Sequence, residues 1–134
     1  MHRTRQIHVS RNTLTGVIMS SSENFVYAIY DELFEENFNR YKDILNQPTD
    51  DGKDSFARAR NALASLDETE RSQVINFLKV VIFDSASVIL GTLDGVHFPN
   101  NIDGDFLLFC DGKEIQGSLA DIFIEKAQDA GIYE

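Results

Sequence analysis

The chain has 134 residues, a length that suits one domain with a substantial core. Its apolar fraction of 43% and charged fraction of 25% are typical of globular proteins and exclude an intrinsically disordered chain. A net charge of −10 argues against binding to nucleic acid phosphates or anionic membranes, and favours a basic partner over an acidic one. The simpler alternative is that the acidity only keeps the protein soluble.

Membrane insertion and disulfide bonding are also disfavoured. The longest nearly uninterrupted apolar run is Val80 to Phe83, far short of the ~20 residues of a membrane span. Cys110 is the only cysteine, so no internal disulfide can form. A cytoplasmic location is therefore expected.

The N-terminal residues 1–18 differ in charge from the rest of the chain. They contain three arginines and no acid, so residues 19–134 hold 9 basic and 22 acidic residues, a net charge of −13. Met19 is a candidate start of translation. We expect residues 1–18 to form a flexible extension, with a short strand at Gln6–Ser10 as the alternative, and residues 19–134 to form a single helical domain.

The first helix is expected from about Ser21 to Asn46. Ser20 and Glu23 have the spacing of a capping box, and apolar residues then recur every three or four positions. Acidic residues lie mostly outside this stripe and form a candidate contact surface for a basic partner, unless they are simply a solvated face. These candidate residues are Asp31, Glu32, Glu35 and Glu36.

A shorter helix, Lys53–Ser65, is predicted after the break at Pro48. The third helix, Asp67–Leu93, again opens with capping-box spacing and is apolar around most of its circumference. Such a helix is predicted to lie in the middle of the bundle or in a subunit interface, which favours a homodimer. Its narrow polar strip should face solvent or a pocket. The strip consists of Gln73, Asn76, Asp84 and Ser87.

The C-terminal part predicts a β-hairpin and a last helix. Asp111-Gly112 separates two strand-like runs and is typical of a two-residue turn that pairs Cys110 with Lys113. The last helix is expected to begin at Ser118. The fold class is therefore α+β, mostly α: a bundle of about four helices around a central apolar helix, with one C-terminal β-hairpin before the last helix.

The sequence contains few residues in patterns typical of catalysis or metal binding. Asp94, His97 and Cys110 are the one set that could resemble a nucleophilic site, but the match is weak, and we assign no catalytic residue, cofactor or metal. The favoured function is a non-enzymatic interaction protein of the inhibitor or immunity type. The alternative is a small-molecule-binding protein or minor enzyme, with a pocket between the central helix and the hairpin near Asp84 and His97.

Overall fold

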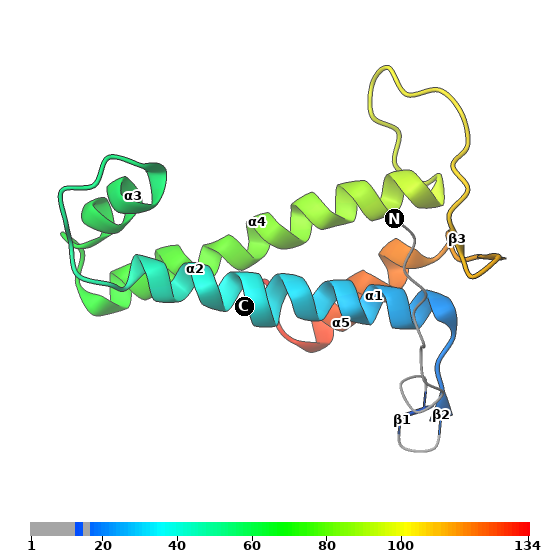
Figure 1. The fold of residues 1–134 in the computed structure, drawn as a ribbon, viewed down its shortest axis with the longest axis horizontal. Coiled ribbons are helices and arrows are strands. Elements are labelled where there is room, and N and C mark those ends of the chain that lie inside the picture. The colour runs from blue at the N-terminus through cyan, green and yellow to red at the C-terminus, as the bar shows by residue number, and fades with distance from the viewer. Residues whose placement is uncertain (1–12, 15–16) are drawn as a thin grey trace.

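Two long antiparallel helical segments form the frame of the molecule in the computed structural model, which describes residues 13–14 and 17–134 (Figure 1). The first segment is continuous and consists of α1 (Ser21–Asp31), the π-helical turn η2 (Glu32–Asn37) and α2 (Phe38–Leu45). The second is α4 (Glu68–Asp94). The long axis of the molecule follows these two segments.

Two shorter helices pack at opposite ends of this frame. α3 (Ser55–Leu63) contacts α2 at one end, and α5 (Leu119–Asp129) contacts α1 and α4 at the other. The strands β3 (Phe109–Cys110) and β4 (Lys113–Glu114) pair just before α5, and β1 (Thr13–Leu14) pairs with β2 (Val17–Ile18). The predicted fold class, mostly α with a hairpin before the last helix, is confirmed.

The helix starts follow the capping chemistry that the sequence predicts. Both capping boxes form: Ser20 with Glu23 at α1, and Asp67 with Glu70 at α4. α4 ends at Gly95, whose φ of 77° lies in the left-handed region that glycine adopts at low cost.

The π-helical turn keeps the buried aromatic side chains of the first helical segment on one face. Phe38 donates its backbone N–H to the Leu33 carbonyl, five residues earlier, so this turn holds more residues than an α-helical turn. Tyr30, Phe34 and Phe38 follow each other at four-residue spacing, which would drift by about 40° per step in a regular α-helix. The wider turn offsets that drift, and all three side chains are buried.

An aromatic cluster forms the larger core, where α5 meets α1 and α4. Phe123 of α5 is fully buried and stacks on Phe83 of α4, with ring centroids 5.4 Å apart. Tyr30 and Phe34 pack on the other side of Phe123. A smaller core at the opposite end consists of Phe38, Leu45 and Ile75.

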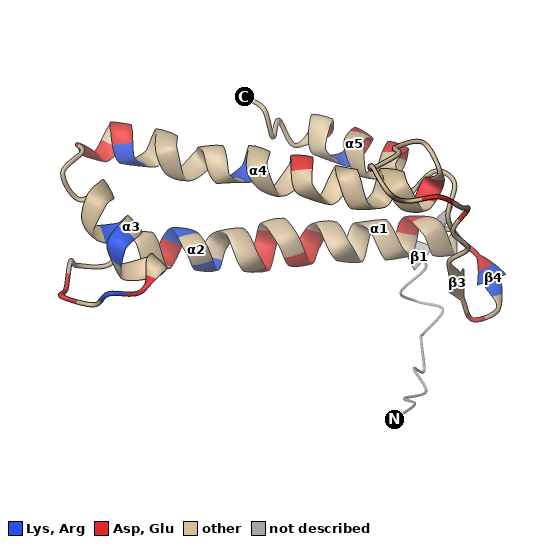
Figure 2. Ribbon diagram, turned by 90° about the horizontal axis from the view of Figure 1, so that it is seen from above, with Lys and Arg blue, Asp and Glu red and all other residues tan. Residues whose placement is uncertain are grey.

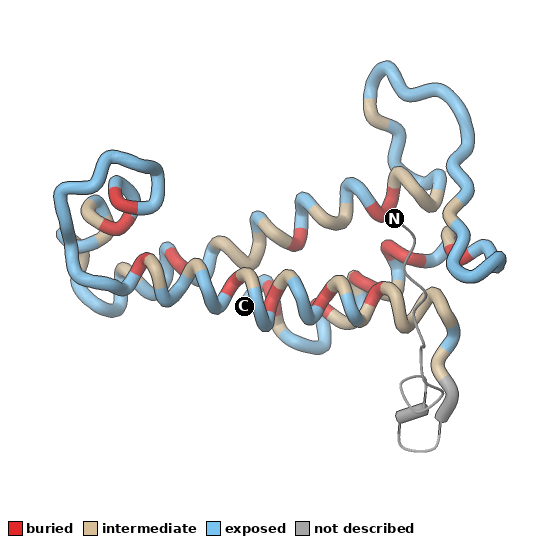
Figure 3. Tube along the Cα trace, viewed as in Figure 1, coloured by how far each residue is buried: buried red, intermediate tan, exposed pale blue. Residues whose placement is uncertain are grey.

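The sequence predicts α4 in the middle of the bundle or in a subunit interface, and the single chain covers it only in part. Its buried residues are Ile75, Phe83, Leu90 and Gly91, and long stretches of its surface remain exposed (Figure 3). Phe77 and Ile89 are 60% and 62% exposed. The helices that pack on α4 are too few to cover a circumference this apolar. Of the predicted polar strip, Gln73, Asn76 and Asp84 are exposed and Ser87 is half-buried.

By length and composition alone, α4 is the one helix among the described residues that could cross a membrane. A core helix of a soluble protein meets the same criterion, so this is weak evidence for a span. Lys79 and Asp84 also lie in its central turns, where a bilayer would make both charges costly.

The hairpin has the predicted register, with Cys110 opposite Lys113 and positive φ angles at Asp111 and Gly112. All four strand residues are exposed. Ile115, directly after β4, is buried, and its carbonyl accepts a hydrogen bond from the Ser22 hydroxyl. The predictions for Gln6–Ser10, and for most of the extension 1–18, lie outside the described residues.

Candidate functional site

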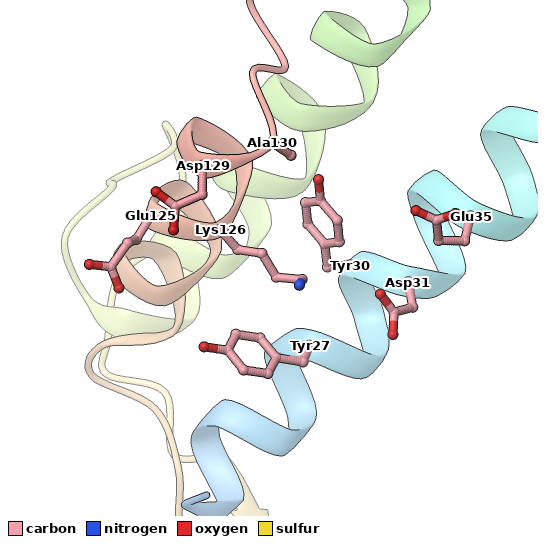
Figure 4. A pocket seen from close by; sticks show the side chains of 8 residues that line it. All are labelled: Tyr27, Tyr30, Asp31, Glu35, Glu125, Lys126, Asp129 and Ala130. Carbon is pink, nitrogen blue, oxygen red and sulfur yellow. The ribbon is translucent and has the colours of Figure 1, made fainter. Parts of the chain in front are cut away.

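The four acidic candidates of the first helical segment are all exposed, but they face two directions. Asp31 and Glu35, one helical turn apart, line a cleft between the first segment and α5 (Figure 4). Glu32 and Glu36 do not line it. The structure therefore divides the predicted contact surface into two pairs, one of which belongs to a concave site.

The far wall of this cleft is also acidic. Glu125 and Asp129, one turn apart on α5, also line the cleft, which has a volume of about 420 Å³. Their carboxylates point away from Asp31 and Glu35, whereas Lys126 points towards the first segment (Figure 4). Figure 2 shows acidic residues on both of these helices. We call this site the acidic cleft, defined by Tyr27, Tyr30, Asp31, Glu35, Glu125, Lys126, Asp129 and Ala130.

Lys126 is the one basic side chain of the acidic cleft. Its Nζ lies 4.8 Å from the ring centroid of Tyr27 and 4.8 Å from that of Tyr30, so the ammonium contacts two aromatic faces. Within the described residues it forms no ion pair with any of the four carboxylates. The lining thus holds four carboxylates and one ammonium, which gives the cleft a net negative charge.

Tyr30 forms the floor of the acidic cleft. Its ring is buried against Phe34, with centroids 4.5 Å apart, and its pKa is raised above 10.0 by burial first and then by the negative charges of Glu35 and Asp31. Glu35 and Asp31 thus add to burial in favouring the neutral phenol. Their field favours a cation at this position.

Asp84 and His97, the other two candidates, lie outside the acidic cleft. Asp84 is exposed on α4 and accepts a hydrogen bond from the hydroxyl of Tyr133, whose ring meets Phe83 edge-on at 5.3 Å. His97 is exposed just after α4 and donates its backbone N–H to the Gly91 carbonyl at 3.1 Å. The structure assigns these two residues to local contacts and does not bring them together with the acidic candidates.

The weak Cys-His-acid pattern does not assemble into a nucleophilic arrangement in the described residues. Both carboxylate oxygens of Asp94 accept hydrogen bonds from backbone N–H groups at the start of α5. Cys110 is exposed at the hairpin turn. An acid that is engaged by a helix terminus is not free to orient a histidine.

Three further clefts adjoin one another along α4 and are apolar. They lie between α4, the first helical segment and α3, and none of them is lined by a hairpin residue. The pocket proposed between α4 and the hairpin, near Asp84 and His97, therefore has no counterpart among these four clefts.

Sequence reasoning missed the α5 half of the acidic cleft. Glu125 and Asp129 are four residues apart on the polar side of the last helix, a signal that was present. That these two residues would line the same cleft as Asp31 and Glu35 depends on how α5 docks, which no local pattern contains. Among the described residues, no three His, Cys, Asp or Glu side chains are grouped to hold a metal ion.

Comparisons with known proteins add no relative. No family model, curated protein or solved structure matches this chain.

Proposed function

We propose that this protein is a non-enzymatic interaction protein of the inhibitor or immunity type, which binds a basic protein partner in the acidic cleft. The observation that supports this most is that four carboxylates, from two helical segments, line one cleft together with two tyrosine rings. Carboxylates beside aromatic faces are the groups that recognise arginine and lysine side chains.

The charge of the whole chain supports the same partner class. Three arginines lie in residues 1–18, so residues 19–134 carry a net charge of −13. A field of this sign attracts a basic partner over distances of about a Debye length and raises its association rate. The cleft then supplies the short-range contacts that a flat acidic surface lacks.

Lys126 indicates how a partner would be recognised. Its ammonium occupies the cation position over Tyr27 and Tyr30 without an ion pair to the surrounding carboxylates. An arginine of the partner can therefore use these carboxylates, which remain exposed and accept bidentate hydrogen bonds. Because Lys126 lies on a flexible stem, it can also move aside and leave the ring faces to the partner.

An oligoarginine peptide is the simplest probe of this proposal, with binding measured by isothermal titration calorimetry at low and physiological salt. The double variant Glu35→Gln with Asp129→Asn removes one carboxylate from each wall. We expect it to weaken binding about tenfold, a loss of about 1.4 kcal/mol. Binding to the unaltered chain should weaken as salt is added, since the contacts are ionic.

The double variant Glu32→Gln with Glu36→Gln is the matched control for overall charge, because it also removes two carboxylates, both from the first helical segment and outside the cleft. It should change the affinity by less than about threefold. Equal losses in the two double variants would mean that only the overall charge matters, and would contradict a role for the cleft. Binding that does not depend on salt would contradict it as well.

A cytoplasmic location is the second part of the proposal. The free thiol of Cys110 is exposed, and an exposed thiol is maintained most easily in a reducing compartment. Localisation of a tagged chain by cell fractionation tests this. Recovery of the chain in a membrane or secreted fraction would contradict it.

A further inference from the structure

A continuous apolar face runs along α4 on the side that α5 does not cover. Its main part is a groove of about 480 Å³ between α4 and the first helical segment. The groove shares Tyr41 with a second cleft, which in turn shares Leu45, Ala59 and Leu78 with a third. The three clefts thus join into one surface from α1 to α3, which we call the apolar face.

The apolar face contains no charged side chain. Its polar members are Asn37, Ser55, Ser85 and the hydroxyl of Tyr41, and all other lining residues are hydrocarbon or aromatic. One quarter of the whole chain is charged, so this surface is distinct in composition from the rest. Uninterrupted exposed apolar surface of this kind marks an interface.

The face combines a groove with a row of exposed side chains on α4, two of which, Val74 and Val81, also line the clefts. Beside the groove, α4 presents a ridge of exposed side chains at three-, four- and seven-residue spacing, namely Val74, Phe77, Val81 and Val88. Ridge and groove share one helix and lie next to each other. A two-fold axis can therefore seat the ridge of each copy in the groove of the other, which is the geometry of an isologous interface.

We propose that a second copy of this chain packs on the apolar face and forms a two-fold symmetric dimer. The size of the surface fits this occupant. The three clefts are lined by about twenty residues, and one side of a standard protein interface contributes ~20–30. The exposed part of α4 from Val74 to Ile89 is about 22 Å long at ~1.5 Å per residue, long enough for a helix-to-helix contact of several turns.

The distribution of charge permits two acidic chains to meet here. The carboxylates of the acidic cleft lie between the first helical segment and α5, and none of them lines the apolar face. Dimerisation therefore buries none of these four carboxylates. Asp84, which lies between Val81 and Val88 on the ridge, has the hydroxyl of Tyr133 as its hydrogen-bond partner, and a buried carboxylate is less costly when it is paired. Dimerisation also leaves the acidic cleft of each copy open, so the dimer and the proposed partner site are independent.

The test is the mass of the full chain in solution, measured by light scattering and sedimentation velocity across the micromolar range. We expect twice the chain mass of 15.1 kDa. Ile89→Glu places a charge in the groove at a residue that is 62% exposed in the single chain, so the monomer should keep its fold. It should raise the dimer dissociation constant at least about tenfold.

Phe98→Glu is the matched control, since it adds the same charge at an exposed apolar residue outside the face. It should leave the dimer intact. Phe77→Ser, on the ridge, repeats the test without adding a charge, and circular dichroism establishes that each variant is folded. A monomeric mass for the unaltered chain, or unchanged dimerisation in both Ile89→Glu and Phe77→Ser, would overturn the proposal.

Vesicles of phosphatidylcholine test the competing occupant, a lipid surface. A dimer should not cosediment with them, because its apolar faces are covered. Cosedimentation of the unaltered chain that Ile89→Glu abolishes would overturn the dimer and assign the face to a membrane.

Discussion

The carboxylate of Asp94 caps a helix to which Asp94 does not belong: its Oδ2 accepts a hydrogen bond from the backbone N–H of Ala120 at 2.7 Å. Oδ1 accepts two more, from Gly117 at 2.6 Å and Leu119 at 3.1 Å. Asp94 is the last residue of α4, and these amides form the start of α5. One negative charge therefore satisfies two of the free donors of α5, interacts favourably with its dipole and ties it to α4.

Replacing Asp94 with alanine should lower the free energy of unfolding by about 2 kcal/mol, because three backbone donors lose a charged acceptor. Urea unfolding followed by circular dichroism measures the loss. Asp105→Ala serves as the control, since Asp105 is exposed in a loop and its carboxylate accepts no hydrogen bond within the described residues. Equal losses in the two variants would contradict the capping role.

The same contact shows where sequence reasoning stops. Ser118 precedes α5 as predicted, but its side chain makes no capping hydrogen bond. The acceptor comes instead from Asp94, far earlier in the chain, and only the docking of α5 on α4 brings it there. Local signals sufficed at α1 and α4, where Ser20 and Asp67 cap their own helices.

The sequence shows that most of the circumference of α4 is apolar, but it does not show how much of that surface the single chain buries. The apolar circumference of Asp67–Leu93 correctly indicates surface that must be covered, yet periodicity does not state how many neighbouring helices exist. The candidate site follows the same pattern. Asp31 and Glu35 were identified because they lie outside the apolar stripe of the first helix, whereas Glu125 and Asp129 join them through tertiary contact between α1 and α5.

The ion pair between Arg60 and Asp50 leads to a second stability prediction. Arg60 is 8% exposed, its Nη2 lies 2.8 Å from Asp50 Oδ2, and its buried Nε has no hydrogen-bond partner in the described residues. Asp50→Asn removes the counter-charge and should destabilise the fold by about 1 kcal/mol, a value reduced because Asp50 itself is half exposed.

Arg60→Leu removes the buried charge together with its unpaired donor, so it should cost less than Asp50→Asn. Asp51→Asn is the control for loss of charge alone, because Asp51 is the exposed neighbour and forms no ion pair within the described residues. Chemical denaturation of the three variants gives the order of stability. A greater loss in Arg60→Leu than in Asp50→Asn would contradict this account.

The raised pKa of Tyr30 predicts a loss of stability at alkaline pH. Burial, then Glu35 and Asp31, favour the neutral phenol in the folded state, whereas the unfolded chain ionises near pH 10. The contribution of Tyr30 is therefore fully present below pH ~10 and is lost as pH rises through the folded-state pKa. Tyr30→Phe should show a shallower decline of unfolding free energy above pH ~10.

Glu35→Gln provides the companion measurement, because it should lower the pKa of Tyr30 towards 10 without removing the ring. Tyrosinate absorbance, recorded as the difference between each protein and its Tyr30→Phe counterpart, follows this one titration. An unshifted difference curve in Glu35→Gln would mean that Glu35 does not act on the floor of the acidic cleft.

The extra residue of η2 allows a prediction about chain deletions. A single deletion in a regular α-helix rotates all that follows by about 100°, which takes one half of an apolar stripe out of the core. The turn Glu32–Asn37 holds i to i+5 hydrogen bonds, as Phe38 to Leu33 shows, and so has one residue more than an α-helical turn. Deleting one residue there converts it to an α-helical turn without that rotation.

Deletion of Glu36, which is exposed, should therefore cost less than about 1 kcal/mol of unfolding free energy. Deletion of Ala28, exposed in α1, should cost about 3 kcal/mol or more, because it takes buried Val26 or Tyr30 out of the aromatic core. Thermal and urea unfolding of the two deletion variants measures the difference. Both deletions remove an exposed side chain, so they differ only in whether the helix phase changes. If deletion of Glu36 is as harmful as deletion of Ala28, the correct phase of α1 relative to α2 depends on the wide turn itself.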